Sequence, residues 1–141
     1  MELTDVKDED LKRCAEYHGH LGPGVTAGCR AAKYAVKLLG TELTENADIV
    51  CVSENDGCCK DAFKVLLGCS EEKGSLLFDL SDKMAFSFYD NASGRSVKLT
   101  LTDRDPGLSD EEWLKMLIDK KDDELFEVSE TTFLLKYSDR T

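Results

Sequence analysis

Two histidines close together in this sequence have the side-chain type and spacing that suit metal binding or proton transfer. Both histidines of the chain lie in His18-Gly19-His20, and Pro23-Gly24 follows closely. Glycine and proline at this density interrupt a helix, so we expect a shaped loop that presents imidazoles beside the next helix. His20 is the better candidate for a ligand or an acid-base group. His18 shares a helix face with apolar residues, and a hydrogen-bonded core histidine explains it equally well.

Cys58 adds a third reactive group. It lies in the first turn of a helix expected to end at Gly68, where the positive end of the helix dipole stabilises a thiolate. Asp61 follows on the same helix face, and its charge raises the thiol pKa unless a cation lies between them. A divalent metal would satisfy both groups, because thiolate, imidazole and carboxylate are all zinc ligands. We therefore expect a metal or anion held by His20 and Cys58, with His18 as a further ligand and Asp61 or Glu54 hydrogen-bonded behind the ligands. Zinc is the first choice, with nickel or iron as alternatives.

Two other interpretations of Cys58 stay open. The spacing is weakly specific, and a buried structural thiol accounts for it more often than a functional one. Cys58 could instead be the nucleophile of a cysteine hydrolase, with His20 as base and Asp61 or Glu54 as orienting carboxylate. The hydrolase is the least favoured, because no recognised cysteine-hydrolase signature surrounds either residue.

The element before Cys58 reads as a central strand. The apolar run from 49 to 52 is rich in branched residues, as expected of a strand covered on both faces. The run ends at Glu54 and turns into the Cys58 helix, and such a strand-loop-helix corner is where open α/β sheets usually place ligands. Glu54 is therefore a candidate cofactor-binding residue. Lys73, in a later polar loop, is a second one that could hold an anion, although a solvated lysine explains it as well.

Helices and strands are expected on both sides of this corner. A first helix should be capped by Thr4 or Asp5, and a second should run over residues 25–39 and stop at Gly40. Three alternating segments at 75–80, 83–89 and 95–102 read as hairpins of an antiparallel meander. Ser109 and Glu112 form a capping box for a later helix that packs through Trp113. The last strands are expected at 125–128 and 132–137.

The second helix also predicts an assembly. Its polar positions form one narrow stripe of Thr26, Arg30, Lys33 and Lys37, while the rest of its surface is apolar. A small domain has limited surface with which to cover such a helix, so we expect a homodimer in which a second subunit covers part of it.

Composition restricts the class of protein. The 141 residues suit one domain with its own core, and the net charge of −11 makes nucleic acid and anionic membranes poor partners. The N-terminus has neither a basic start nor an apolar run, so we expect a cytoplasmic protein. Its six cysteines are then expected to be reduced, because thiols are the default without a secretion signal.

Taken together, the motifs resemble a known family. The motifs are His18-Gly19-His20 with Pro23-Gly24, then Glu54, Cys58 and Asp61-Ala62, then Gly68-Cys69 and Lys73-Gly74. Their order along the chain is the order found in the FmdE family. Proteins of this family are associated with molybdenum formylmethanofuran dehydrogenase. The match covers residues 18–94, and the combination is far more specific than any single motif.

The resemblance implies a fold, an assembly and a site. The expected fold is α+β, with a thioredoxin-like core and a mixed, largely antiparallel sheet flanked by helices. Tight dimers and a pocket between the histidine loop and the cysteine helix are implied as well. Some relatives add a C-terminal zinc finger, and residues 1–141 are expected to be the core domain alone.

One position departs from the family pattern. Members usually carry a cysteine where this chain has Gly22, so a thiol of the pocket is missing. Either the site binds its ligand through fewer protein groups, or this chain has lost the original activity. Two functions are therefore weighed ahead of the hydrolase. One is a metal-dependent or redox domain that works with a molybdenum-enzyme subunit, and the other a noncatalytic accessory protein that binds a cofactor or small-molecule ligand.

Overall fold

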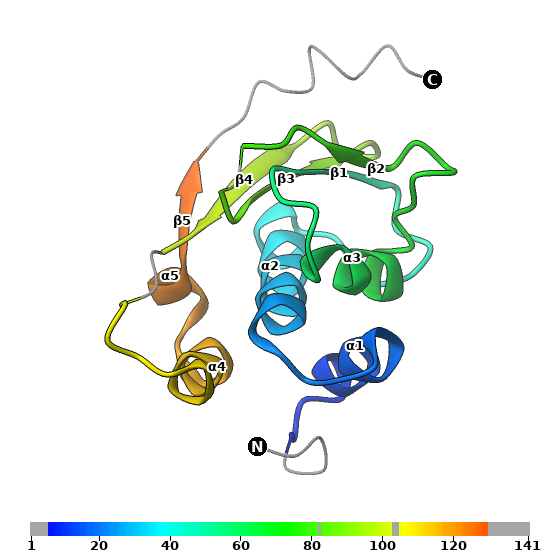
Figure 1. The fold of residues 1–141 in the computed structure, drawn as a ribbon. Helices are drawn as coiled ribbons and strands as arrows, with labels where there is room; N and C mark the ends of the chain where they lie inside the picture. The colour runs from blue at the N-terminus through cyan, green and yellow to red at the C-terminus, as the bar shows by residue number, and fades with distance from the viewer. Residues whose placement is uncertain (1–5, 82, 103–104, 130–141) are drawn as a thin grey trace.

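The five-stranded sheet has its helices on one side only (Figure 1). Some of these helices pack directly on the sheet, and others pack on those helices, away from the sheet. The computed structural model describes residues 6–81, 83–102 and 105–129. The helices are α1 (Glu9–His18), α2 (Pro23–Leu39), α3 (Cys59–Leu67), α4 (Asp110–Asp119) and the short α5 (Asp122–Leu125). None of the described helices has the length and apolar character needed to span a membrane.

The sheet is mixed and largely antiparallel, which confirms the predicted α+β class. Its order is β2-β1-β3-β4-β5, with β1 and β2 parallel and the other neighbours antiparallel. The strands are β1 (Ile49–Ser53), β2 (Leu76–Phe78), β3 (Ala85–Asp90), β4 (Ser96–Leu101) and β5 (Phe126–Ser129).

The predicted hairpin between β2 and β3 is wrong. β1 lies between these strands, pairing with β2 through Cys51 and Leu76 and with β3 through Cys51 and Phe88. The physical reason is the apolar character of β1, which is best buried at an interior position of the sheet. The β3 and β4 hairpin forms as predicted, and its register pairs Phe88 with Val97.

The helix ends around the histidines follow from local chemistry. α1 begins after Asp8, whose carboxylate accepts hydrogen bonds from the backbone N–H groups of Asp10 and Leu11. The predicted caps at residues 4 and 5 lie outside the described residues. α1 ends at Gly19, which adopts the left-handed conformation (φ 105°) that glycine accepts at low cost. The chain therefore turns between the two histidines, as the sequence indicates.

A helix-helix contact fixes α3, and with it Cys58, against α2. A Cβ atom at Gly28 would lie 2.5 Å from the carbonyl oxygen of Cys59, so the two helices approach closely at a position that needs glycine. Below this contact, the Phe63 ring packs edge-on against those of Phe86 and Phe88 on β3. α3 is thus held by backbone contact with α2 at Cys59 and by aromatic packing against β3 at Phe63.

The burial of α2 comes from its own chain. α2 contacts α1, α3, α4, β3 and β4, and Ala31 and Ala35 are completely buried among them. The predicted polar stripe is also more buried than expected, because Thr26 has no exposed surface and its hydroxyl donates to the Gly22 carbonyl. Burial of α2 therefore no longer requires a second subunit.

The C-terminal part of the described chain completes the sheet. The predicted capping box is confirmed, since Ser109 and Glu112 exchange side-chain and backbone hydrogen bonds at the start of α4. Trp113 is buried in the core, as expected. β5 then adds an antiparallel edge strand beside β4. The strand predicted at 132–137 lies outside the described residues.

Candidate functional site

The loop between α1 and α2 meets the start of α3 at one corner of the molecule. Gly24 lies against Cys58, because a Cβ atom added at Gly24 would lie 2.9 Å from the Cβ of Cys58. Cys59, the next residue, points its thiol to the Gly24 carbonyl oxygen at 3.0 Å. Two contacts thus hold the histidine loop and the cysteine helix together, and the predicted neighbourhood of these two motifs is present.

His18 is held by a carboxylate. Its Nδ1 atom lies 2.6 Å from Oδ2 of Asp61, and both side chains are mostly buried, with 15% and 21% of their surface exposed. A carboxylate accepts hydrogen bonds, so this contact favours the form of His18 that carries a proton on Nδ1. Nε2 is then the ring nitrogen with a lone pair for a metal. Asp61 therefore orients His18. The sequence predicted a carboxylate, Asp61 or Glu54, behind the ligands but did not say which histidine it would contact.

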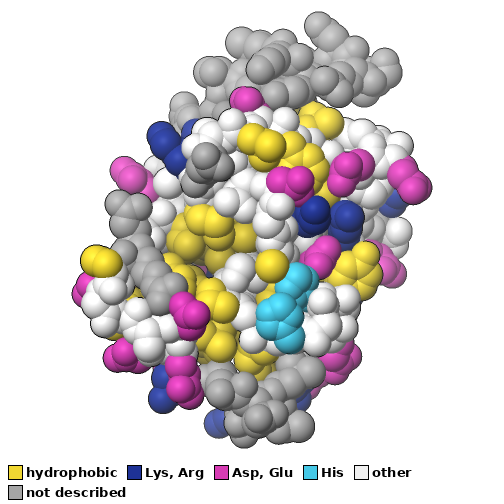
Figure 2. Space-filling model, viewed as in Figure 1, with side chains coloured by type: hydrophobic (Ala, Val, Ile, Leu, Met, Phe, Trp, Pro, Cys, Tyr) yellow, Lys and Arg dark blue, Asp and Glu magenta, His cyan; other side chains and the backbone are white. Residues whose placement is uncertain are grey.

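His20 stands beside His18 at the surface. The two ring centroids are 4.7 Å apart with a tilt of 42°, and His20 is exposed. Figure 2 shows the two imidazoles side by side on one face, next to exposed apolar side chains. A Cβ atom at Gly22 would lie 3.0 Å from Nε2 of His20, so this nitrogen faces the position that has no side chain.

Cys58 differs from the other five cysteines. It precedes α3 as the N-cap residue, makes no side-chain capping hydrogen bond and is exposed, whereas the others are buried. All six are free thiols. Burial raises the pKa of Cys59 and of Cys69 to about 12, and that of Cys51 well above its ordinary value. Of the six thiols, Cys58 is therefore the one placed to react or to bind a ligand from solution.

The candidate metal ligands are neighbours without forming a complete set. Across residues 6–81, 83–102 and 105–129, no three or more His, Cys, Asp or Glu side chains are arranged to hold a metal ion. The donor types nevertheless suit a transition metal, since two neighbouring imidazoles and an exposed thiol lie at this corner. The three-ligand site therefore stays a prediction.

Glu54 and Lys73 have partners of their own. Glu54 accepts hydrogen bonds from Ser81 (2.6 Å) and from the Lys98 ammonium (2.8 Å). Burial alone would raise the pKa of Glu54, but the hydrogen bonds from Lys98 and Ser81 outweigh burial and hold that pKa below its ordinary value. Lys73 donates to the Gly68 carbonyl oxygen at 3.3 Å. These contacts fix loops beside the sheet, and the cofactor-binding roles of Glu54 and Lys73 stay predictions.

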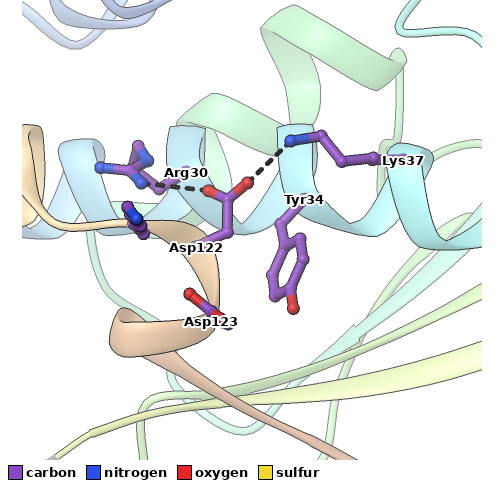
Figure 3. A pocket seen from close by; sticks show the side chains of 6 residues that line it. Arg30, Tyr34, Lys37, Asp122 and Asp123 are labelled. Carbon is purple, nitrogen blue, oxygen red and sulfur yellow. Dashed lines mark hydrogen bonds and ion pairs between the residues drawn. The ribbon is translucent and has the colours of Figure 1, made fainter.

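A hollow of about 440 Å³ lies between α2 and the start of α5 (Figure 3). Arg30 and Lys37 both pair with the Asp122 carboxylate there, each at 3.0 Å. Arg30 also donates to the carbonyl oxygens of Leu117 (2.6 Å), Ile118 (3.0 Å) and Lys120 (2.5 Å). Burial alone would raise the pKa of Asp122, but hydrogen bonds from Lys37 and Arg30 outweigh it and lower that pKa.

This hollow corrects the sequence interpretation of the polar stripe. Arg30 is 15% exposed and binds the end of α4, so the stripe is a packing surface at this point. The pairing of Arg30 with Asp122 could not be predicted from the sequence. Arg30 on α2 and the acidic run at 122–124 are far apart along the chain, and only folding brings them together. Both terminal nitrogens of Arg30 and both oxygens of Asp122 have protein partners, which makes the hollow a structural contact.

Comparisons with known proteins agree with this architecture. An FmdE-like protein from Syntrophus aciditrophicus, described as resembling part of a tungsten formylmethanofuran dehydrogenase, superposes with a TM-score of 0.68. The superposition covers 87% of this chain and 70% of that one, at 24% identity, and so shows the fold. A probable S-adenosyl-L-methionine-binding protein of Archaeoglobus fulgidus is 35% identical over 72 residues. That match takes in 48% of this chain and only a fifth (20%) of the relative.

The family pattern matches most of the chain. Residues 17–133 match the family described as FmdE, molybdenum formylmethanofuran dehydrogenase operon. The matched range includes both histidines, Cys58 and Asp61, together with the elements from α2 to β5. On this match the chain belongs to the FmdE family.

Proposed function

We propose that this protein is a metal-binding domain that works with a molybdenum-enzyme subunit. The observation that carries the proposal is the 2.6 Å contact between His18 Nδ1 and Asp61. Histidines that bind metals usually donate their other ring N–H to a carboxylate, which fixes the ring and makes its free nitrogen more basic. A second imidazole and an exposed thiol lie at the same corner.

The roles of the residues follow from their positions. His18 through Nε2, His20 and Cys58 would hold the ion, and Asp61 would orient His18. When bound, zinc supplies Lewis acidity and lowers the pKa of a bound water molecule; nickel or iron would add redox chemistry. The contact with Asp61 favours the His18 tautomer with its proton on Nδ1, and the chain places the Cys58 thiol at a helix start.

A noncatalytic accessory role is the second candidate. The family is described by an operon, and the Archaeoglobus relative is named for S-adenosyl-L-methionine binding. The apolar side chains beside the histidines in Figure 2 would suit the organic part of such a ligand. Calorimetric titration of the metal-free protein with S-adenosyl-L-methionine tests this role. Saturable binding that survives His20→Ala would favour it over the metal site.

The cysteine hydrolase is the least supported of the three. A hydrolase base must bond to the nucleophile through one nitrogen while a carboxylate orients the other. Here Asp61 orients His18, whereas His20, the predicted base, directs Nε2 at Gly22. Within the described part of the chain, no hydrogen bond joins either imidazole to the Cys58 thiol.

Metal analysis of protein purified without oxygen tests the main proposal. After exposure to zinc, nickel or iron and removal of excess metal, wild type should retain about one equivalent. His18→Ala, His20→Ala and Cys58→Ser should each lower affinity by at least about tenfold. Tyr17→Ala is the matched control, since this neighbouring side chain is 60% exposed. Equal metal content in wild type and all three ligand variants would overturn the proposal.

A homodimer and a cytoplasmic location also remain proposals. An isologous dimer next to the histidine loop would shelter the exposed site, although the burial of α2 does not require it. Light scattering at micromolar concentration measures the mass directly. A monomer at all concentrations would remove the dimer and leave the metal proposal standing.

A further inference from the structure

β5 is an edge strand of the sheet, because among the described residues it pairs with β4 alone. Where this pairing begins, the backbone N–H of Thr102 donates to the Leu125 carbonyl oxygen at 2.8 Å. In an antiparallel ladder, successive residues point their N–H and C=O groups alternately toward and away from the neighbouring strand. Glu127 and Ser129 therefore direct these groups at β4, and Val128 directs both of its own outward.

The side chain of Val128 is available as well. It is 44% exposed, which is unusual for a large hydrophobic residue in the described part of the chain. Val128 pairs with the buried Leu99 and so lies on the helix side of the sheet, where it lines a hollow of about 280 Å³ together with Leu38 and Val97. An exposed apolar side chain on an open sheet edge marks a surface to which another strand can add.

We propose that β5 pairs antiparallel with β5 of a second copy of this chain, about a two-fold axis at Val128. Each Val128 then donates its N–H to the Val128 carbonyl oxygen of the other copy, and the two side chains meet on the helix side, beside the hollow. This surface differs from the one next to the histidine loop (Figure 1), and the inference does not depend on the proposed metal site.

The charges of β5 favour this register. With the axis at Val128, Glu127 of one copy lies opposite Ser129 of the other on the outer face of the sheet, where a hydroxyl can donate to a carboxylate. An axis at Glu127 would set two carboxylates against each other and would need backbone groups that already point at β4. The backbone pattern, the charges and the exposed apolar side chain therefore all select Val128 as the centre.

The contact is short, so the dimer should be reversible. β5 has four residues, and two such strands bury less than the roughly 1,200 Å² of a stable interface. We therefore expect a monomer at low micromolar concentration and a dissociation constant on the order of 100 μM. Sedimentation equilibrium of the full chain between about 5 and 500 μM measures this constant.

Substitutions at Val128 test the centre of the interface. Val128→Lys places two like charges at the axis and should keep the protein monomeric at every concentration. Val128→Pro removes an N–H that β4 does not use, which an edge strand tolerates, and should weaken the dimer at least about tenfold. Leu80→Lys is the matched control, because Leu80 is 62% exposed and follows β2 at the opposite edge of the sheet. It should dimerise like wild type.

An exchange of charges tests the register. Ser129→Glu places a carboxylate opposite Lys98 on β4, so the folded monomer should keep its thermal stability. The same carboxylate opposes Glu127 of the second copy and should weaken the dimer about tenfold. Adding Glu127→Lys to Ser129→Glu sets opposite charges across the pair and should restore at least the wild-type dissociation constant.

Three results would overturn this proposal. Wild type could stay monomeric over the whole range, the dimer could persist in Val128→Lys, or the charge exchange could fail to restore dimerisation. Persistence in Val128→Lys would place the interface elsewhere, such as beside the histidine loop. In a monomer, slow hydrogen exchange of the Val128 amide would show that the chain's own residues after 129 occupy this edge instead of a second copy.

Discussion

The histidine corner and the Arg30 corner use similar numbers of polar side chains in opposite ways. At the Arg30 corner, one guanidinium donates to three carbonyl oxygens and to Asp122, which also accepts from Lys37. At the histidine corner, one ring nitrogen is tied to Asp61, whereas His20 and Cys58 are exposed at the surface. At the first corner the terminal nitrogens of Arg30 and both oxygens of Asp122 already have partners, whereas the second has two exposed donor groups.

This difference shows which polar groups stabilise the fold and which remain available to bind a ligand. Polar groups that satisfy one another fix helices in place and cannot bind a ligand without losing those bonds. The exposed imidazole and thiol groups at the histidine corner contribute little to stability and remain free to bind a ligand. A polar hollow in the surface is therefore a poorer sign of a site than an exposed donor on a fixed support.

The largest expected effect is on the Arg30 corner. Arg30→Ala removes the donor to the carbonyl oxygens at the end of α4 and breaks the ion pair with Asp122. We therefore expect the free energy of unfolding to fall by about 3 kcal/mol. Urea denaturation measures it. Lys37→Ala is the control, because its side chain is 70% exposed and should cost less than about 1 kcal/mol. Equal losses in the two variants would show that Arg30 is only another surface cation.

A helix contact that supports the histidine corner should rank second. Gly28→Ala pushes a methyl group into the backbone of α3 at Cys59, and we expect a loss of about 2 kcal/mol despite the better helix propensity of alanine. Gly22→Ala meets only the movable end of His20 and should stay within about 1 kcal/mol of wild type. Thermal unfolding of both variants gives the comparison, which fails if Gly28→Ala is neutral.

Thiol reactivity measures how available the histidine corner is. At limiting iodoacetamide, Cys58 should be alkylated at least about tenfold faster than any other cysteine, because the other five are buried. Peptide mass mapping identifies the labelled residues. Added zinc should protect Cys58 if the metal proposal holds. Preferential labelling of Cys14 or Cys29 would contradict the packing of α1 against α2.

The smallest expected effect is a pH dependence at the Arg30 corner. The folded-state pKa of Asp122 lies below the ordinary value of 3.8, so its contribution is complete above that value and is lost as pH falls through the folded pKa. Asp122→Asn should therefore be less stable by on the order of 1 kcal/mol near neutrality. Its deficit should shrink below about pH 4. Urea midpoints across this range test it, and a constant deficit would refute the linkage.

Much of the fold was readable from local chemistry. The helix expected over 25–39 occurs as Pro23–Leu39 and stops at Gly40, since a fixed φ at proline and a left-handed glycine are local signals. The capping box at Ser109 is equally local. The position of β1 between β2 and β3 could not be predicted from the sequence. β2 has only three residues, and its pairing with β1 depends on a strand distant in the sequence rather than on local residues.

The candidate site was predicted only in part. His20 and Cys58 were predicted to lie at one corner, because each lies at a junction between a loop and the start of a helix, where ligand-binding side chains often gather. The partner of Asp61 was not predictable, since His18 lies 43 positions away and either Cys58 or a solvent ion could have occupied that carboxylate. The contacts of Glu54 and Lys73 show the limit again. Both residues were predicted to bind a ligand because of the loops in which they lie. Their side chains instead hydrogen-bond to other residues of the chain.

The bonds of Arg30 connect residues 87 to 92 positions apart, and this separation has a kinetic consequence. Closing so long a segment costs chain entropy, so contacts of this kind form late in folding, after the local helices and the β3 and β4 hairpin. Interactions that form after the folding barrier govern the rate of unfolding far more than the rate of folding. We therefore expect the contacts of Arg30 with α4 and α5 to lengthen the lifetime of the folded state, although they lie far along the chain from the histidines.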